Sequence, residues 1–247
     1  MFFDGFSLKK AKYILRMIRL EQIAFIGTYD KKDLILNVAK VLTECGLKVL
    51  VVDATLMQRL KYIVPKISNN SITYISEYLG IDVALGFINL NGIAQYLGNA
   101  SNIPYDYVII DTDNIQTMNS FMVDKSKKIY VVTSYEQYEL RRTIELLKYY
   151  NRPIEVTKVV FSADLENNQE EYFNKLLSET PVILKKDIVE YADTTQDRKV
   201  TLQNQLMGDL SLYHYSSTYK DSLEYHTSLL AEGRAEQSII RRIIRKK

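Results

Sequence analysis

The sequence predicts a single α/β domain, in which a doubly wound and mostly parallel β-sheet is flanked by helices. Short apolar runs rich in Val and Ile alternate along the chain with segments of helical periodicity, as in consecutive β-α-β units. The 247 residues suffice for one large α/β domain, and no convincing domain boundary interrupts them. At 47% hydrophobic and 25% charged residues the chain can bury a core, which excludes a disordered or fibrous protein.

Six apolar runs are predicted to be strands. They are apolar at successive positions rather than at alternate ones, which is typical of a parallel sheet covered on both faces. The predicted strands are residues 22–27, 48–53, 107–111, 129–133 and 157–162, and the shorter run 181–184.

Two segments between these strands have a clear helical period. Residues 31–45 place Leu34, Val38 and Leu42 on one face, and Gly46 is the predicted C-cap. Residues 135–150 form a second predicted helix that stops near Pro153. The ligand face of such a domain is expected at the carboxyl ends of the strands.

Several function classes are excluded by composition. One cysteine, Cys45, leaves no disulfide framework and no cysteine-based zinc site. No apolar run approaches the roughly 18 residues of a membrane span, and the first residues lack the apolar core of a secretory signal, so we expect an intracellular protein. His214 and His226 have no nucleophile motif nearby and are expected at a surface or interface.

Charge is distributed unevenly along the chain. Residues 8–19 and residues 238–247 each carry five cations and no acid. Together these two ends carry a charge of +10. Because the net charge of the whole chain is +2, the remainder carries −8. We divide the chain into a basic amphipathic N-terminal helix (1–21), an α/β domain (22–220) and a C-terminal helical segment with a basic tail (221–247). Such a charge distribution indicates binding to a partner, because it does not specify a fold.

The C-terminal tail is predicted to be an amphipathic helix. Four isoleucines fall on one side and three arginines on the other; these are Ile239, Ile240, Ile243 and Ile244, and Arg241, Arg242 and Arg245. An apolar face beside cations suits an anionic membrane surface better than DNA, which has no use for the isoleucines. Docking into a protein partner, or packing of the isoleucines on the domain itself, are the alternatives.

Two segments carry a family resemblance. The first is the βαβ unit at residues 22–56, where Leu34, Asn37, Val38 and Ala39 follow a short loop and the next strand ends at Asp53. The second is the strand of residues 107–111, which ends at Asp111. Together they resemble the MinD/ParA family of P-loop ATPases over residues 22 to about 200. The resemblance implies a P-loop NTPase fold, a nucleotide site at the first loop and a homodimer.

The first loop departs from the family pattern. Lys31 falls where the resemblance places the P-loop lysine, Asp30 where it places a glycine, and Lys32 and Asp33 where it places hydroxyl residues. A phosphate loop needs glycines for its backbone N–H groups and a hydroxyl for Mg²⁺, and carboxylates repel a triphosphate. After the second strand the family usually has Asp-x-Asp, whereas here Asp53 is followed by Ala54 and Thr55, so the second aspartate is absent.

We therefore expect a vestigial nucleotide site at Lys31, Lys32, Asp53 and Asp111, with no catalytic residue, no metal and no cofactor. The alternative assigns the two aspartates to turns and the lysines to a solvated helix end. Asp113 and Asp111 form a pair of carboxylates that is weak support for a cation site.

The resemblance extends to TadZ, a pilus-assembly relative, and implies a non-catalytic scaffold. Such a protein would recruit a partner, or secretion or pilus machinery, to the inner face of the cell membrane. The alternative is a divergent ATPase that binds ATP and Mg²⁺ and possesses DNA affinity.

A tyrosine cluster near the C-terminus resembles that of bacterial tyrosine kinases. It consists of Tyr213, Tyr215, Tyr219 and Tyr225. Kinase chemistry would need the phosphate loop, so we expect these rings to pack in a half-buried environment instead.

Overall fold

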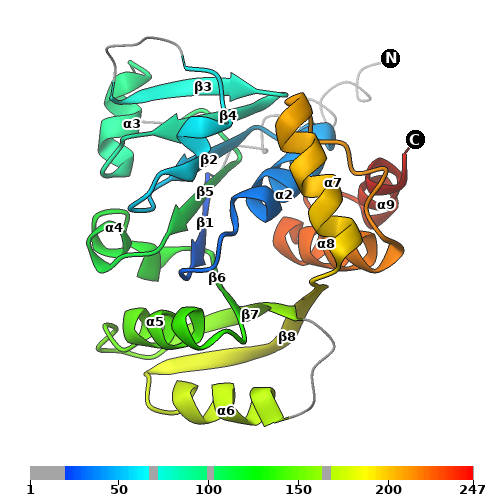
Figure 1. Ribbon diagram of the computed structural model, residues 1–247. Helices are drawn as coiled ribbons and strands as arrows, with labels where there is room; N and C mark the ends of the chain where they lie inside the picture. Colours follow the sequence, from blue (N-terminus) through cyan, green and yellow to red (C-terminus); the bar gives the residue numbers. More distant parts are fainter. Residues whose placement is uncertain (1–19, 67–71, 99–102, 163–167, 247) are drawn as a thin grey trace, which may run out of the picture.

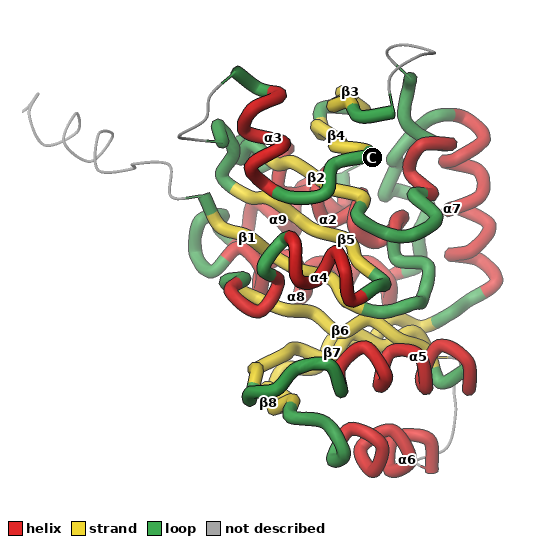
Figure 2. Tube along the Cα trace, turned by 90° about the vertical axis from the view of Figure 1, so that its left-hand side faces the viewer, coloured by secondary structure: helices red, strands yellow, loops and turns green. Residues whose placement is uncertain are grey.

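The computed structural model describes residues 20–66, 72–98, 103–162 and 168–246. Within these ranges the chain forms an eight-stranded sheet in the order β3-β4-β2-β5-β1-β6-β7-β8. Figure 2 shows the sheet running from β3 at one end to β8 at the other. The strands are β1 (Glu21–Ile26), β2 (Val49–Asp53), β3 (Tyr74–Tyr78), β4 (Ile81–Leu85), β5 (Tyr107–Thr112), β6 (Lys128–Ser134), β7 (Ile154–Ser162) and β8 (Val182–Ala192).

The predicted doubly wound sheet is confirmed. Neighbouring strands are parallel except for β3 and β4, which pair antiparallel. The first five predicted strands correspond to β1, β2, β5, β6 and β7. The hairpin of β3 and β4 was not predicted, because Ser76 and Glu77 interrupt the apolar residues of β3 (YISEY), which is an edge strand.

The last strand is longer than the predicted run 181–184. β8 continues through the charged residues Lys185, Lys186 and Asp187 to Ala192. The register between β7 and β8 shifts at this point, because Val156 pairs with Leu184 whereas Lys158 pairs with Ile188. A bulge of charged residues on an edge strand interrupts the apolar pattern on which the sequence prediction depended.

Helices cover both faces of the sheet. Figure 1 shows α2, α7, α8 and α9 to the right of the sheet, and α3 and α4 to its left. Two buried clusters fill these layers, one beneath α2, α8 and α9 and the other beneath α3, α4, α5 and α6. The helices are α2 (Lys32–Glu44), α3 (Leu90–Tyr96), α4 (Ile115–Ser120), α5 (Gln137–Leu147), α6 (Asn168–Leu177), α7 (Thr195–Met207), α8 (Ser217–Ala231) and α9 (Gln237–Arg245), with 3₁₀ turns η1 (Arg59–Tyr62) and η2 (Val123–Lys125).

Both predicted helices are present, slightly shorter than expected. α2 buries eight of its residues, including Leu34, Val38 and Leu42. Cys45 is its C-cap, and Gly46 follows with φ 84°. The second predicted helix is α5.

The C-terminal residues are part of the core. The boundary predicted between residues 220 and 221 falls within α8, and α9 packs on α8 and α2. Ile240 and Ile244 are both 0% exposed, so these two do not face a bilayer, contrary to the membrane interpretation; the alternative of packing on the domain holds for them. Ile239 and Ile243 are partly buried.

His226 is also buried, which contradicts the expectation of a surface or interface residue. Its ring is 0% exposed and lies against Phe25 and Tyr130, with Nδ1 3.1 Å from the Tyr191 hydroxyl. Burial, together with the nearby charge of Lys128, lowers the pKa of His226 to about 3. The imidazole is therefore a neutral core residue.

None of the described helices is long and apolar enough to cross a lipid bilayer. The predicted N-terminal helix lies outside the described residues.

Candidate functional site

The candidate site lies at the carboxyl ends of the central strands. The loop of residues 27–31 joins β1 to α2, Asp53 ends β2, and Asp111 lies opposite Asp53 in the adjacent strand β5. Parallel strands bring these positions together, so the four predicted residues, Lys31, Lys32, Asp53 and Asp111, line one small pocket.

The loop begins at a position that only glycine can occupy. Gly27 has φ 137°, and a Cβ placed on it would lie 2.1 Å from the carbonyl oxygen of Val132 in β6. The first turn of the loop is therefore tightly packed on the neighbouring strand.

The side chain of Lys31 folds back against the carboxyl ends of the central strands. Its side chain is 2% exposed, and its Nζ lies 2.7 Å from Asp111 Oδ1. The same ammonium donates a hydrogen bond of 2.6 Å to the Gly27 carbonyl. Burial raises the pKa of Asp111 to about 7, and Asp53 adds to the increase, which Lys31 partly offsets. The lysine at the predicted phosphate position is thus already paired.

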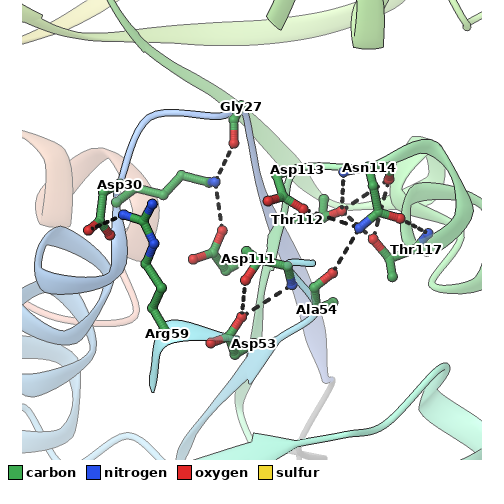
Figure 3. A network of polar contacts seen from close by, with 12 residues as sticks. Gly27, Asp30, Asp53, Ala54, Arg59, Asp111, Thr112, Asp113, Asn114 and Thr117 are labelled. Atoms are coloured by element: carbon green, nitrogen blue, oxygen red, sulfur yellow. Dashed lines mark hydrogen bonds and ion pairs between the residues drawn. The ribbon is translucent and has the colours of Figure 1, made fainter. Parts of the chain in front are cut away.

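A second ion-pair cluster covers the loop. Lys32 Nζ lies 2.7 Å from Asp30 and 3.1 Å from Asp33. Arg59, from η1, contacts the same Asp30 carboxylate at 2.6 Å, as Figure 3 shows. Burial opposes ionisation of Asp30, but Lys32 and then Arg59 hold its pKa below the usual value. Nothing in the sequence pattern around Arg59 indicated that it would reach this site.

Asp53 holds the chain that follows β2. Its carboxylate accepts hydrogen bonds from the Thr55 backbone N–H at 3.1 Å, the Thr55 hydroxyl at 2.6 Å and the Leu60 N–H at 2.9 Å. Asp113 accepts from the N–H of Leu56 at 2.9 Å. The turn function that the sequence left open for Asp53 is therefore present.

ATP and Mg²⁺ do not fit this arrangement. The pocket has a volume of about 40 Å³, which admits about three water molecules. Asp30 and Asp111 both line the pocket with carboxylates, and Lys31 is paired with Asp111. Among the residues that the structure describes, no three acidic, histidine or cysteine side chains are grouped to hold a metal ion. No phosphoryl-transfer step follows from these residues.

A larger groove opens beside the pocket. It has a volume of about 450 Å³ and lies between the first turn of α2, the start of α5, the ends of β7 and β8, and α7. Tyr29 and Phe161 line the groove and stack on each other with ring centroids 4.5 Å apart. Sequence reasoning missed this groove, because it is assembled from separate segments between residues 29 and 219.

The signature residue Asn37 has a packing role. It is buried in α2, and its amide donates a hydrogen bond of 2.8 Å to the hydroxyl of Tyr219 in α8. Tyr219 stacks on Tyr215 at 4.2 Å, and both rings are buried. Tyr213 and Tyr225 are 40% and 43% exposed. Two members of the tyrosine cluster therefore join the last helices to the domain.

The sheet order and the flanking helices are those of a doubly wound α/β protein. More narrowly, the chain has the fold of the P-loop ATPases of the MinD/ParA type. A ParA family ATPase from Chlorobium tepidum TLS is 14% identical, with 86% of this chain and 99% of that chain covered and a TM-score of 0.55.

Two MinD structures have the same fold. The septum site-determining protein MinD from Pyrococcus horikoshii OT3, complexed with Mg-ADP, is 15% identical over 86% of this chain and 98% of that one, with a TM-score of 0.53. The MinC:MinD cell division protein complex of Aquifex aeolicus is 17% identical over 90% and 93%, with a TM-score of 0.50. No family model and no curated protein matches the sequence.

Proposed function

We propose that this chain is a non-catalytic scaffold with the MinD/ParA fold, which self-associates and recruits a partner protein. The observation that carries the proposal is the engagement of Lys31, whose ammonium is held by both Asp111 and the Gly27 carbonyl. The resemblance to TadZ in the first loop points in the same direction, toward positioning of secretion or pilus machinery.

The energetics of the pocket oppose nucleotide binding. A triphosphate would have to draw Lys31 away from Asp111 and would leave that buried carboxylate without its partner. Removing one partner of a buried ion pair costs about 3–5 kcal/mol. The triphosphate would also approach Asp30, which is held at the mouth of the pocket by Lys32 and Arg59.

Calorimetric titration with Mg·ATP tests this proposal. We expect no binding in the micromolar range and no hydrolysis, and we expect Lys31→Ala to change neither result. Micromolar affinity that disappears in the Lys31→Ala protein would contradict the scaffold proposal. A double variant, Asp30→Gly with Lys32→Thr, restores a glycine and a hydroxyl, and shows whether the assay detects a reopened loop.

One observation favours the alternative of a divergent ATPase. Lys31, Lys32, Asp53 and Asp111 all line a single pocket at the ligand edge of the sheet. If the Lys31–Asp111 pair opened, these residues would offer two cations and two carboxylates to ATP and Mg²⁺. ATP turnover abolished by Lys31→Ala would favour this enzyme.

For the partner, we propose a protein that docks on the assembled scaffold. Among the proteins of similar fold, the Aquifex aeolicus MinD has been solved in a complex with MinC. That precedent concerns MinD and supports only the general idea that this fold presents a surface to a partner.

We also propose peripheral association with the inner membrane surface, through the cationic side of α9. Arg241 and Arg242 are exposed there, whereas Ile240 and Ile244 are committed to the core. The association would therefore be mainly electrostatic, at about 1 kcal/mol for each basic residue near an anionic leaflet.

Co-sedimentation with vesicles that contain anionic lipid measures this contact. Arg241→Glu with Arg242→Glu should abolish sedimentation, whereas the control Lys125→Glu with Lys186→Glu, which alters exposed cations on other elements, should not. Binding to duplex DNA with a steep salt dependence, and none to vesicles, would overturn the membrane proposal.

A further inference from the structure

An apolar face of α7 lies uncovered beside the groove. Leu202, which lines the groove, is 54% exposed, and Leu206 and Met207 in the following turn are 87% and 74% exposed. Leu202 and Leu206 are four residues apart and so lie on one side of the helix. Clustered exposed apolar residues next to a cavity are typical of a binding surface.

The groove itself is acidic. Its charged side chains are six carboxylates and three cations, a net charge of −3; they are Asp30, Asp33, Glu136, Glu139, Asp193 and Asp197, with Lys32, Arg59 and Arg198. Lys32 and Arg59 are already paired with the carboxylates of α2 and the preceding loop.

Two of these carboxylates are free to meet a partner. Glu136 and Asp193 are exposed and make no ion pair with any residue of the described ranges. Glu139, one turn into α5, is half-buried, and burial raises its pKa, with the nearby charges of Glu136 and Asp30 adding to the increase. Arg198 is also without an ion pair among the described residues, and it lies on the α7 side of the groove. The charges of the groove that are not paired within the chain are therefore mainly negative, and they favour binding of a cationic segment.

The chain contains a segment with the complementary chemistry. Residues 8–19 (LKKAKYILRMIR) carry five cations and no acid. At helical spacing, Lys9, Lys12 and Arg16 form a stripe opposite Ile14 and Ile18. The cations match the carboxylates of the groove, and the isoleucines match the uncovered face of α7.

We propose that residues 8–19 of one copy dock into the groove of a second copy, against α7. Docking within one chain is disfavoured by the position of Leu20, which immediately precedes β1 at the amino edge of the sheet. The groove lies at the opposite edge, about 20 Å away along the six residues of β1.

A helix formed by residues 8–19 would be about 18 Å long and would have no linker to Leu20. Such a helix could bring only its far end to the groove of its own chain. A second copy is under no such constraint, and a reciprocal exchange of the two segments gives a closed dimer. This inference rests on the proposed self-association, and it does not depend on the closed nucleotide pocket.

A charge-swap experiment on the full chain tests the contact. One variant reverses the segment (Lys9→Glu, Lys12→Glu, Arg16→Glu), and a second reverses the groove (Glu136→Lys, Asp193→Lys). Sedimentation velocity should find a dimer for the unaltered chain, with an affinity that falls as salt is added. Each variant alone should dimerise about tenfold more weakly or worse, since like charges then face each other. An equimolar mixture of the two variants should regain a dimer.

Two controls separate this contact from general charge or folding effects. Glu171→Lys with Glu236→Lys makes the same change in charge on residues that do not line the groove, and should dimerise as the unaltered chain does. The far-UV circular dichroism of both charge-swap variants should match that of the unaltered chain.

A dimer that ignores both charge reversals would overturn the inference while leaving the proposed self-association intact. A monomer at tens of micromolar and low salt would overturn both. Neither result bears on whether Mg·ATP binds, which the calorimetric titration measures separately.

Discussion

The closed pocket and the open groove lie side by side at the same edge of the sheet, and they use charge in opposite ways. In the pocket, every cation is committed to a neighbour within the chain: Lys31 to Asp111, and Lys32 and Arg59 to Asp30. In the groove, Glu136 and Asp193 are exposed and make no ion pair within the described part of the chain.

The pocket, whose cations are all paired, is also much smaller than the groove. The Lys31–Asp111 ion pair joins the loop of residues 27–31 to β5, and the pocket there has about 40 Å³, whereas the groove between α5 and α7 has about 450 Å³. A surface whose charges are satisfied internally contributes to stability, while one with unsatisfied charges can recruit a partner. The paired charges of the pocket therefore stabilise the fold, whereas the unpaired acids of the groove are where we propose that a partner segment binds.

The largest expected effect comes from breaking the pocket. Lys31→Ala leaves Asp111 buried near Asp53 and without its counter-ion, so the free energy of unfolding should fall by about 3–5 kcal/mol. Urea denaturation measures the loss. Lys32→Ala is the matched control on the next residue, and it should cost about 1 kcal/mol or less because Lys32 pairs with partly exposed carboxylates.

The loss in Lys31→Ala should also depend on pH. The folded-state pKa of Asp111 is raised to about 7, above its unfolded value of about 3.9, so the folded state binds more protons between these values and stability falls as pH rises through them. Without Lys31 the pKa of Asp111 rises further, and the destabilisation should be greater near pH 8 than near pH 5. An equal loss at both pH values would argue against a charged Asp111 as its source.

The smallest expected effect concerns the groove. Glu136→Ala with Asp193→Ala removes two charges that no described side chain pairs, so the free energy of unfolding should change by no more than about 0.5 kcal/mol. The same urea titration serves as the measurement. A loss comparable with that of Lys31→Ala would mean that the groove acids serve the fold, and it would erase the contrast between the two sites.

The sequence predicted the centre of the fold better than its edges. β1, β2, β5, β6 and β7 are continuous apolar runs, because both of their faces are buried. β3 and β8 are edge strands, which carry polar residues that break such runs, and their pairing depends on residues distant in the sequence. The local sequence pattern therefore does not reveal that pairing.

The pocket was predicted from spacing, since residues at the carboxyl ends of adjacent parallel strands must meet. Lys31, Asp53 and Asp111 do meet. Arg59 was missed because it reaches the site from a short turn without periodicity. The isoleucines of α9 and the imidazole of His226 were misplaced for a related reason. An amphipathic helix has the same pattern whether its apolar face meets a bilayer or α8.

The charged bulge in β8 limits how copies of this protein can meet. As the last strand of the sheet, β8 would otherwise offer its free backbone groups to the same strand of another molecule, and sheets growing in this way become fibrils. The pairing of β8 with β7 shifts register at Lys158, where β8 carries Lys185, Lys186 and Asp187. This charged bulge interrupts the row of backbone groups of β8 halfway along the strand. Strand addition at the β8 edge is thereby disfavoured, so contacts between copies on this side of the sheet depend on side chains, where they can be specific and reversible.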